Sequence, residues 1–287
     1  MYTICIQFEY RMDGRLLNIR RFGAASRLHQ YIIRMLLFAD DCALFAHSEE
    51  ELQRMATIFA ITASKFGLDS NTSKTVSFFQ PGAGVTPTPR ITIGANDIEN
   101  CKDFCYLGSI LSTDLSVDRE LRSRVAKASV AFGRLDRRVW KNHNLKMETK
   151  LLVYKAMVLS TLLYGSETWT VYQRNVSYLN RFHLQSVRLI LGIRWTDMVP
   201  NTEVLRRTGI DSIDAILMLN HLRWLGHVRR MYDNDITKQL LYGLLKTVIP
   251  VIKNCDVKML SGFVHNAVMP LVVYGKMLLH IKPLGAV

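Results

Sequence analysis

The chain has 287 residues, 49% of them hydrophobic, which is enough for two domains with apolar cores. Lys and Arg number 37 against 24 Asp and Glu, a formal net charge of +13. This excess suits a polyanionic partner such as nucleic acid, with a solvated basic surface as the alternative. Five scattered cysteines exclude a disulfide or zinc framework. Because Glu9 and Arg11 interrupt the first residues, no secretory signal is expected, and we expect an intracellular protein of the nucleus or cytoplasm.

The first predicted element is a β-hairpin that turns at Asp13-Gly14. Apolar residues alternate before this turn and recur after it. They are Ile4, Ile6, Phe8 and Tyr10 on one side and Leu16, Leu17 and Ile19 on the other.

A second predicted hairpin contains Phe38-Ala39-Asp40-Asp41, set between the apolar runs Met35–Leu37 and Cys42–Phe45. Two adjacent carboxylates cost little free energy at a tight turn, where water solvates both. The pattern therefore predicts two acids at the tip of a hairpin, where their oxygens can bind Mg²⁺. The alternative is an ordinary Asp-rich turn.

A helix and a strand are predicted next. Ser48 and Glu51 form a capping box, and Gly67 supplies the C-terminal stop. Between them, apolar residues recur at helical spacing: Leu52, Met55, Ile58, Phe59, Thr62 and Phe66. The β-type run Val76–Phe79 follows. Residues 80–98 form a Gly- and Pro-rich connection that contains the short β signal Ile91–Ile93.

Residues 104–111 predict a further hairpin, with Leu107 and Gly108 at its turn. The helix predicted after it, over residues 114–141, has an apolar stripe at spacings of three and four: Leu121, Val125, Ala128, Phe132, Leu135 and Val139. Its flanks are basic: Arg119, Arg122, Arg124, Lys127, Arg134, Arg137, Arg138 and Lys141. This basic flank faces phosphate or solvent; we favour nucleic-acid contact over a solvated helix face.

More helices are predicted over residues 147–163 and 176–191, from Asn201 to a stop at Gly209, and from the cap at 211–214 to Met231. The last two faintly resemble a helix-turn-helix, but a packed helical hairpin is the commoner arrangement. His221 and His227 are six residues apart and do not share a helix face, which disfavours a metal pair.

Several motifs occur in one order: Phe-Ala-Asp-Asp, a helix, Gly67-Leu68 with Asn71 and Lys74-Thr75, a strand, and Tyr106-Leu107-Gly108. This order resembles the palm of reverse transcriptases encoded by non-LTR retrotransposons. The resemblance continues through residues 131–135, 162–169 and 222–231, and covers roughly residues 1–243. It implies an α+β fold, with a partial polymerase palm over 1–112 and an all-helical thumb and C-terminal region over 113–243.

The resemblance also implies roles for individual residues. Asp40 and Asp41 would act in catalysis as ligands of Mg²⁺ or Mn²⁺, and Lys74 would assist the departing pyrophosphate, although a surface lysine is the alternative. Leu107 and Gly108 would position a primer phosphate, with a plain structural hairpin as the alternative. The RNA template and DNA primer would lie along basic residues of the thumb helix: Arg122, Lys127, Arg134, Arg137 and Arg138.

One part of the family's metal site is expected to be absent. In the family, the Asp-Asp pair acts with another Asp on an earlier palm strand, which would lie before Met1. An in-line displacement needs both metal ions, so we expect the isolated chain not to polymerise. The alternatives are a non-catalytic nucleic-acid-binding module and a pseudogene product without function.

Residues 244–287 differ in character from the family pattern. The segment is apolar and contains Pro250, Pro270 and Pro283, and no Asp, Glu, Lys or Arg lies between Lys258 and Lys276. That stretch is short and poorly patterned for a membrane span, so a membrane partner is not expected. We expect this tail to lie outside the family fold and to be loosely folded.

Overall fold

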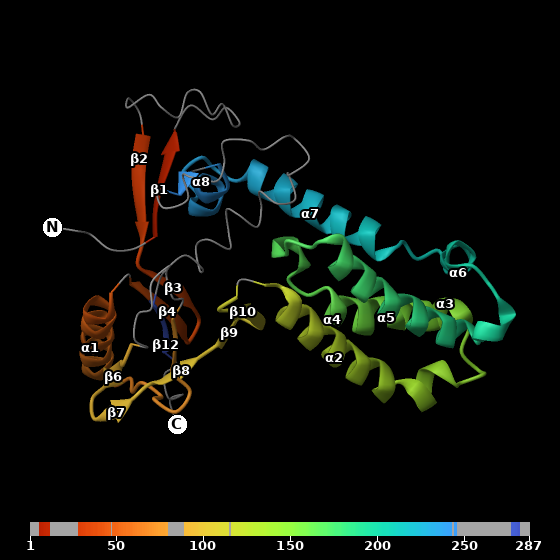
Figure 1. The fold of residues 1–287 in the computed structure, drawn as a ribbon, viewed down its shortest axis with the longest axis horizontal. Coiled ribbons are helices and arrows are strands. Elements are labelled where there is room, and N and C mark those ends of the chain that lie inside the picture. The colour runs from red at the N-terminus through yellow and green to blue at the C-terminus, as the bar shows by residue number, and fades with distance from the viewer. Residues whose placement is uncertain are drawn as a thin grey trace. The chain divides into compact units, whose positions relative to one another are not determined.

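A computed structural model describes residues 6–11, 28–46, 48–79, 89–114, 116–242, 244–245 and 277–281. The described chain is α+β, as predicted, and divides into two compact units. Unit 1 comprises Met1–Ser116 and Arg230–Val287, and unit 2 comprises Val117–Arg229 (Figure 1).

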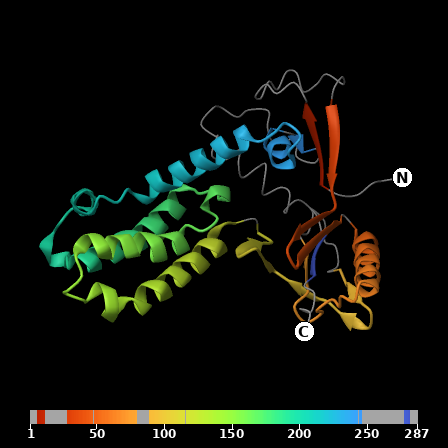
Figure 2. The same ribbon diagram turned by 180° about the vertical axis from the view of Figure 1, so that it is seen from behind.

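The main sheet of unit 1 has five strands in the order β3-β4-β12-β5-β8. These are β3 (Met35–Phe38), β4 (Asp41–Ala46), β12 (Met277–Ile281), β5 (Val76–Phe79) and β8 (Glu99–Cys101). The strand from the C-terminal tail, β12, lies between β4 and β5 and is antiparallel to both. Figure 2 shows it in blue among the red and yellow strands.

Both faces of this sheet are covered at β4, whose residues alternate between them, whereas the edge strand β3 is exposed along its length. Cys42, Leu44 and Ala46 pack into a cluster with α1 (Glu49–Lys65). Ala43 and Phe45 belong to a cluster on the opposite face, which includes residues of β5 and of the hairpin formed by β9 (Asp103–Tyr106) and β10 (Ser109–Ser112). The five residues Cys42–Ala46 are each at most 3% exposed, because neither face meets water.

The α1 helix begins and ends where the sequence predicts. The Ser48 hydroxyl accepts a hydrogen bond from the Glu51 N–H at 3.3 Å, and Gly67 follows the helix with a φ of 71°. Its predicted apolar positions are only partly buried: Leu52 is in the core, whereas Ile58 and Phe66 are exposed.

The remaining strands of unit 1 form smaller sheets. The first has the order β11-β1-β2, and β1 (Ile6–Arg11) pairs with β2 (Leu28–Ile33) and β11 (Leu244–Leu245). The turn expected at Asp13-Gly14 lies outside the described residues, and β1 pairs with strands other than the expected 16–19 run.

Two short strands of unit 1, β6 (Thr92–Ile93) and β7 (Asn96–Asp97), form a small hairpin, and β6 lies within the short β signal predicted at Ile91–Ile93. The helix α8 (Ile236–Tyr242) contributes Leu240 to the cluster that contains Phe45.

Unit 2 is helical throughout its described residues. Its elements are α2 (Asp118–Arg134), η2 (Asp136–Trp140), α3 (Met147–Val153), η3 (Tyr154–Leu159), α4 (Ser160–Leu162), η4 (Ser166–Thr168), α5 (Gln173–Leu191), η5 (Trp195–Asp197), α6 (Asn201–Thr208) and α7 (Ile213–Arg230). The apolar stripe predicted for α2 is confirmed, since Leu121 and Ala128 are buried and the other four positions pack against the same core.

Three polar contacts inside unit 2 help to fix how its helices pack. The Tyr154 hydroxyl and His183 Nδ1 form a hydrogen bond of 2.9 Å between two fully buried side chains. Ser166 accepts a hydrogen bond from Asn220 Nδ2 through its hydroxyl, and its carbonyl lies 2.9 Å from His221 Nε2. His221 therefore ties α7 to the turn at Ser166.

Two segments of the C-terminal tail are described, and both are strands of unit 1, β11 and β12. The expectation that the tail stands outside the family fold stays a prediction. Within the described ranges, no helix has the length and hydropathy needed to span a bilayer.

Candidate functional site

The Asp40-Asp41 pair lies at the turn of the β3–β4 hairpin, as the sequence predicts. Phe38 pairs with Asp41, so Ala39 and Asp40 alone form the turn. Ala39 has a φ of 50°, which costs a residue with a Cβ about 1 kcal/mol. Asp40 is exposed, whereas Asp41 is half-buried as the first residue of β4. The expectation that water solvates both carboxylates therefore holds for Asp40 only.

The predicted Tyr-Leu-Gly hairpin is confirmed and lies against the same sheet. Tyr106 pairs with Ser109, which leaves Leu107 and Gly108 as a two-residue turn with φ values of 48° and 84°. Two positive φ values are the mark of a type I′ turn, whose twist suits a hairpin. Phe104 anchors the hairpin, since its ring lies 6.0 Å from that of Phe78 in β5.

Tyr106 brings the two hairpins together. Burial raises the pKa of its hydroxyl, and the negative charge of Asp41 raises it further. An electrostatic effect of this kind requires the two groups to be close. Asp41 is on the same face of β4 as Ala43 and Phe45, because side chains alternate along a strand. Ala43 and Phe45 pack toward the hairpin that contains Tyr106.

Lys74 lies at the same edge of the sheet as the acids. His280 of β12 pairs with Ala43 on one side and with Val76 on the other, so these two residues are level. Asp41 lies two residues before Ala43 as the first residue of β4, whereas Lys74 lies two residues before Val76 in the turn that precedes β5. Two strand spacings, about 10 Å, separate β4 from β5. The Lys74 side chain is exposed, and its backbone N–H closes a turn onto Asn71.

The carboxylates of this site fit a weakly held divalent cation. Oxygen ligands are those that Mg²⁺ prefers, and one or two carboxylates with water and substrate phosphates commonly hold it. In the described part of the chain, no group of three or more His, Cys, Asp or Glu side chains is arranged to hold a metal ion. Asp40 and Asp41 are two adjacent carboxylates and do not by themselves make up such a group.

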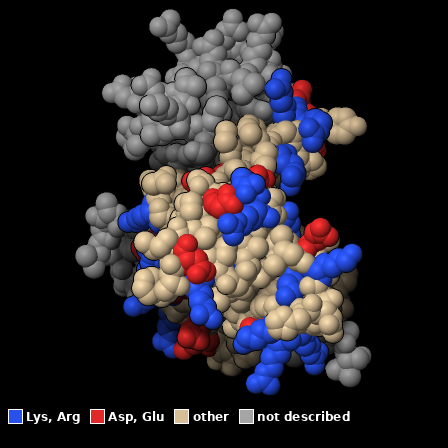
Figure 3. Space-filling model, turned by 90° about the vertical axis from the view of Figure 1, so that its right-hand side faces the viewer, with Lys and Arg blue, Asp and Glu red and all other residues tan. Residues whose placement is uncertain are grey.

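The basic residues predicted on the helix over 114–141 are exposed on α2 and on η2, which follows it, and are here called the α2 basic face. It consists of Arg122, Lys127, Arg134, Arg137 and Arg138. With respect to the residues that the structure describes, none of these five side chains forms an ion pair, whereas the nearby Lys141 pairs with Asp136 at 2.6 Å. Figure 3 shows Lys and Arg spread over the face drawn, with several of them in its lower part.

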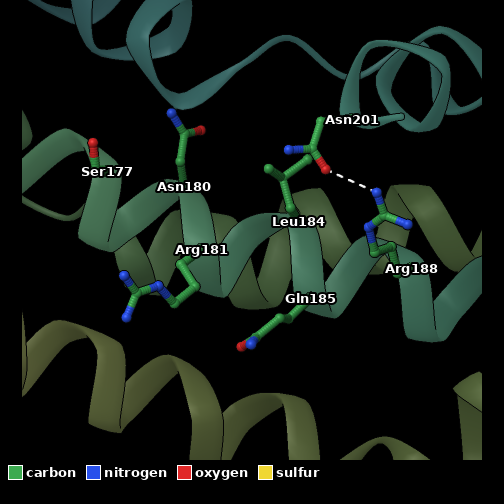
Figure 4. A pocket seen from close by; sticks show the side chains of 7 residues that line it. All are labelled: Ser177, Asn180, Arg181, Leu184, Gln185, Arg188 and Asn201. Atoms are coloured by element: carbon green, nitrogen blue, oxygen red, sulfur yellow. Dashed lines mark hydrogen bonds between the residues drawn. The ribbon is translucent and has the colours of Figure 1, made fainter. Parts of the chain in front are cut away.

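A polar groove of about 440 Å³ lies along α5 on unit 2. Arg188 donates to the Asn201 side chain at 2.8 Å and to the Val199 carbonyl at 2.7 Å, which holds the start of α6 against α5 (Figure 4). The neighbouring Arg181 and Gln185 are exposed and form no ion pair or side-chain hydrogen bond within the described chain. The groove can accept an anion or a polar backbone.

Two features near these sites were not predicted from the sequence, the position of Tyr106 beside Asp41 and a buried ion pair in α2. Tyr106 belongs to the Tyr-Leu-Gly motif, and its position next to Leu107 is the signal that could have indicated a role. The buried ion pair between Glu120 and Arg124, 2.6 Å long, has a signal too, because the two residues are four apart on one helix. The Arg124 guanidinium lies 4.5 Å from the centre of the Tyr164 ring.

Comparisons with known proteins find relatives among the proteins of transposable elements. The chain is 26% identical over 212 residues to a transposon-derived protein of Caenorhabditis elegans, covering 70% of this chain and 74% of that protein. It is 26% identical over 163 residues to a retrovirus-related Pol polyprotein from the type-1 retrotransposable element R1 of Nasonia vitripennis, covering 53% and 48%.

A third relative is the RNA-directed DNA polymerase from the mobile element jockey of Drosophila funebris, 22% identical over 182 residues. The jockey match covers 60% of this chain and 20% of the jockey protein. The chain thus spans only part of these two relatives, about half of the R1 polyprotein and a fifth of the jockey protein. No family model matches the chain, and no solved structure matches it. The chain is related to the reverse transcriptases of non-LTR, LINE-type retrotransposons.

Proposed function

We propose that the chain is a nucleic-acid-binding protein derived from a retrotransposon reverse transcriptase, that unit 1 holds part of the polymerase palm and that unit 2 corresponds to the thumb. In this proposal unit 2 binds an RNA–DNA duplex through the α2 basic face. Unit 1 keeps the Asp40-Asp41 half of the metal site, and the chain alone does not polymerise.

The observation that carries the binding proposal is the α2 basic face itself. Its five cations are exposed and form no ion pair within the described chain, so no acid neutralises them. Between Val117 and Arg229 there are 19 Lys and Arg against 9 Asp and Glu, which concentrates the positive charge of the chain in unit 2. Such a surface favours phosphates and reads little sequence.

The polymerase side of the proposal rests on the edge of the sheet in unit 1. Asp40, Asp41, Lys74 and the turn at Leu107-Gly108 belong to one structural unit, and Asp41 lies near Tyr106. These are the positions that the family resemblance assigns to metal, pyrophosphate and primer. In this proposal Asp40 and Asp41 correspond to one of the two carboxylate positions of the family's metal site. In-line phosphoryl transfer uses two metal ions, which that site holds only when it is complete.

Binding is tested by fluorescence anisotropy with a labelled RNA–DNA duplex at low salt. Replacement of Arg134, Arg137 and Arg138 by Ala is expected to weaken binding at least tenfold. The matched control replaces Arg90, Arg206 and Arg207, which removes the same charge but from residues that are each paired with an acid elsewhere. Equal reductions in affinity for both triple variants would mean that only net charge matters.

Polymerisation is tested by primer extension with Mg²⁺ or Mn²⁺. No extension is expected from the isolated chain. Extension that disappears in Asp40→Ala would contradict the proposed inactivity and show a complete metal site. Extension that persists in Asp40→Ala would point to a contaminating polymerase.

A further inference from the structure

The space between β4 and β5 has the width of one strand. Each of the two strands is antiparallel to β12, so they run parallel to each other, and α1 connects them across the sheet. About 10 Å separates the two backbones, too far for direct hydrogen bonds. A third strand between them can satisfy their facing N–H and C=O groups, and β12, which does so here, is antiparallel to both.

The residues around this space determine which side chains, apolar or polar, a strand between β4 and β5 can have. Leu44 packs toward α1, Phe45 packs toward the β9–β10 hairpin, and Phe78 of β5 is fully buried. An occupant must therefore be apolar on both faces, like a strand buried in the middle of a layered fold. At its C-terminal end, next to Asp41, water is near and a polar residue is acceptable.

The occupant in this chain is Met277–Ile281, which reads Met-Leu-Leu-His-Ile. It makes five register pairs with β4, from Met277–Ala46 to Ile281–Cys42, and four with β5. Its first three residues are apolar and match the buried rows, and His280 is level with Ala43, close to the acidic end. The segment contains no Asp or Glu.

The position of this strand in the sequence makes it replaceable. Residues 246–276 separate it from β11 in the sequence. The segment can therefore pair with its own chain or with another copy, since no short turn joins it to either neighbour.

We propose that the space between β4 and β5 is a strand-acceptor site, and that Met277–Ile281 is its exchangeable occupant. The partner that it fits is the same segment of a second copy of the chain, apolar over its first three residues and with a polar residue, His280, near its C-terminal end. Such a segment pairs antiparallel with β4 and ends beside Asp41. The proposal concerns strand pairing alone and does not depend on nucleic-acid binding.

The test uses the full chain with a specific protease site inserted between residues 246 and 276, cut after folding. The cut tail is expected to stay bound through gel filtration. A fluorescein-labelled peptide of residues 274–284, added in excess, is expected to replace it, and mass spectrometry detects the released tail. The matched peptide with Leu279→Pro is expected to exchange at least tenfold less, because Leu279 pairs with both Leu44 and Ser77.

Two results would overturn the proposal. The cut tail could leave at once while circular dichroism shows that the remaining chain stays folded, which would mean that β12 contributes nothing to the sheet. The tail could also stay bound but refuse exchange with the labelled peptide, which would make it a permanent strand. Transfer of a labelled tail between two copies would support the proposal.

Discussion

Asp41 begins β4 and Tyr106 ends β9, yet the charge of Asp41 contributes to the raised pKa of the Tyr106 hydroxyl, after the larger effect of burial. The two residues belong to hairpins that are far apart in sequence and share one hydrophobic cluster beneath them. The packing of that cluster therefore determines how close Asp41, at the Asp40-Asp41 turn, lies to Tyr106.

The first prediction concerns this pair. Asp41→Asn removes the negative charge, so the pKa of Tyr106 should fall while burial keeps it above the ordinary value. The measurement is an NMR titration of ¹³C-labelled tyrosine, with the signal assigned through Tyr106→Phe. Asp40→Asn is the control, because it removes the same charge from the exposed turn residue next to Asp41. A similar fall in both variants would contradict a specific effect of Asp41.

The second prediction concerns the turn of the Tyr-Leu-Gly hairpin. Leu107 has a φ of 48°, a conformation that Asn tolerates better than Leu. Leu107→Asn should stabilise the chain by about 0.5 to 1 kcal/mol, and the β-branched Leu107→Val should destabilise it by a similar or larger amount. Urea denaturation measures both. Stabilisation by Val would show that the turn is not of type I′.

The third prediction concerns pH. Burial lowers the pKa of His183 from the usual 6.5 to about 4, so the folded protein keeps the ring neutral. As the pH falls, the unfolded chain binds a proton at His183 before the folded protein does. The free energy of unfolding is therefore unaffected by protonation of His183 above pH 6.5 and decreases as the pH falls from 6.5 toward 4. Between pH 7.5 and pH 5 the loss is about 2 kcal/mol.

Chemical denaturation of wild type and His183→Gln at the two pH values measures this loss. The pH dependence of the variant should be smaller by about 2 kcal/mol. His143→Gln is the control, since His143 is on the surface of unit 2 rather than in its core. An unchanged pH dependence in His183→Gln would assign the effect to other groups.

The fourth prediction concerns the buried ion pair of α2. The side chains of Arg124 and Glu120 are 6% and 3% exposed, so removing one partner leaves a charge in the core. Glu120→Leu should destabilise the chain by about 3 kcal/mol or more. The double variant Glu120→Leu, Arg124→Met should lose much less stability, because no lone charge remains. Additive losses in thermal or urea unfolding would contradict this account.

Local structure was largely predictable from the sequence. The β3–β4 and β9–β10 hairpins, the cap at Ser48 and the stripe of α2 depend on residues close together in the chain. The same locality explains why the exposed α2 basic face could be predicted: its residues lie outside the apolar stripe.

Long-range pairing was not predictable. Nothing within Met277–Ile281 specifies β4 and β5 as partners, because many apolar segments can fill a buried strand position. For the same reason the pairing of β1 with β2 was missed in favour of a nearby turn. The half-buried state of Asp41 and its closeness to Tyr106 depend on how two hairpins pack, which no single motif encodes.

The salt dependence of duplex binding tests the central claim most directly. For each phosphate that a variant no longer neutralises, the slope of log K against log salt concentration should fall by about 0.9, a value for duplex DNA. Anisotropy titrations over a range of salt concentrations should give the Arg134, Arg137, Arg138→Ala variant a slope smaller than wild type by about 2 to 3. The Arg90, Arg206, Arg207→Ala control should keep the slope of wild type. Equal slopes for wild type and the α2 variant would contradict duplex binding through the α2 basic face.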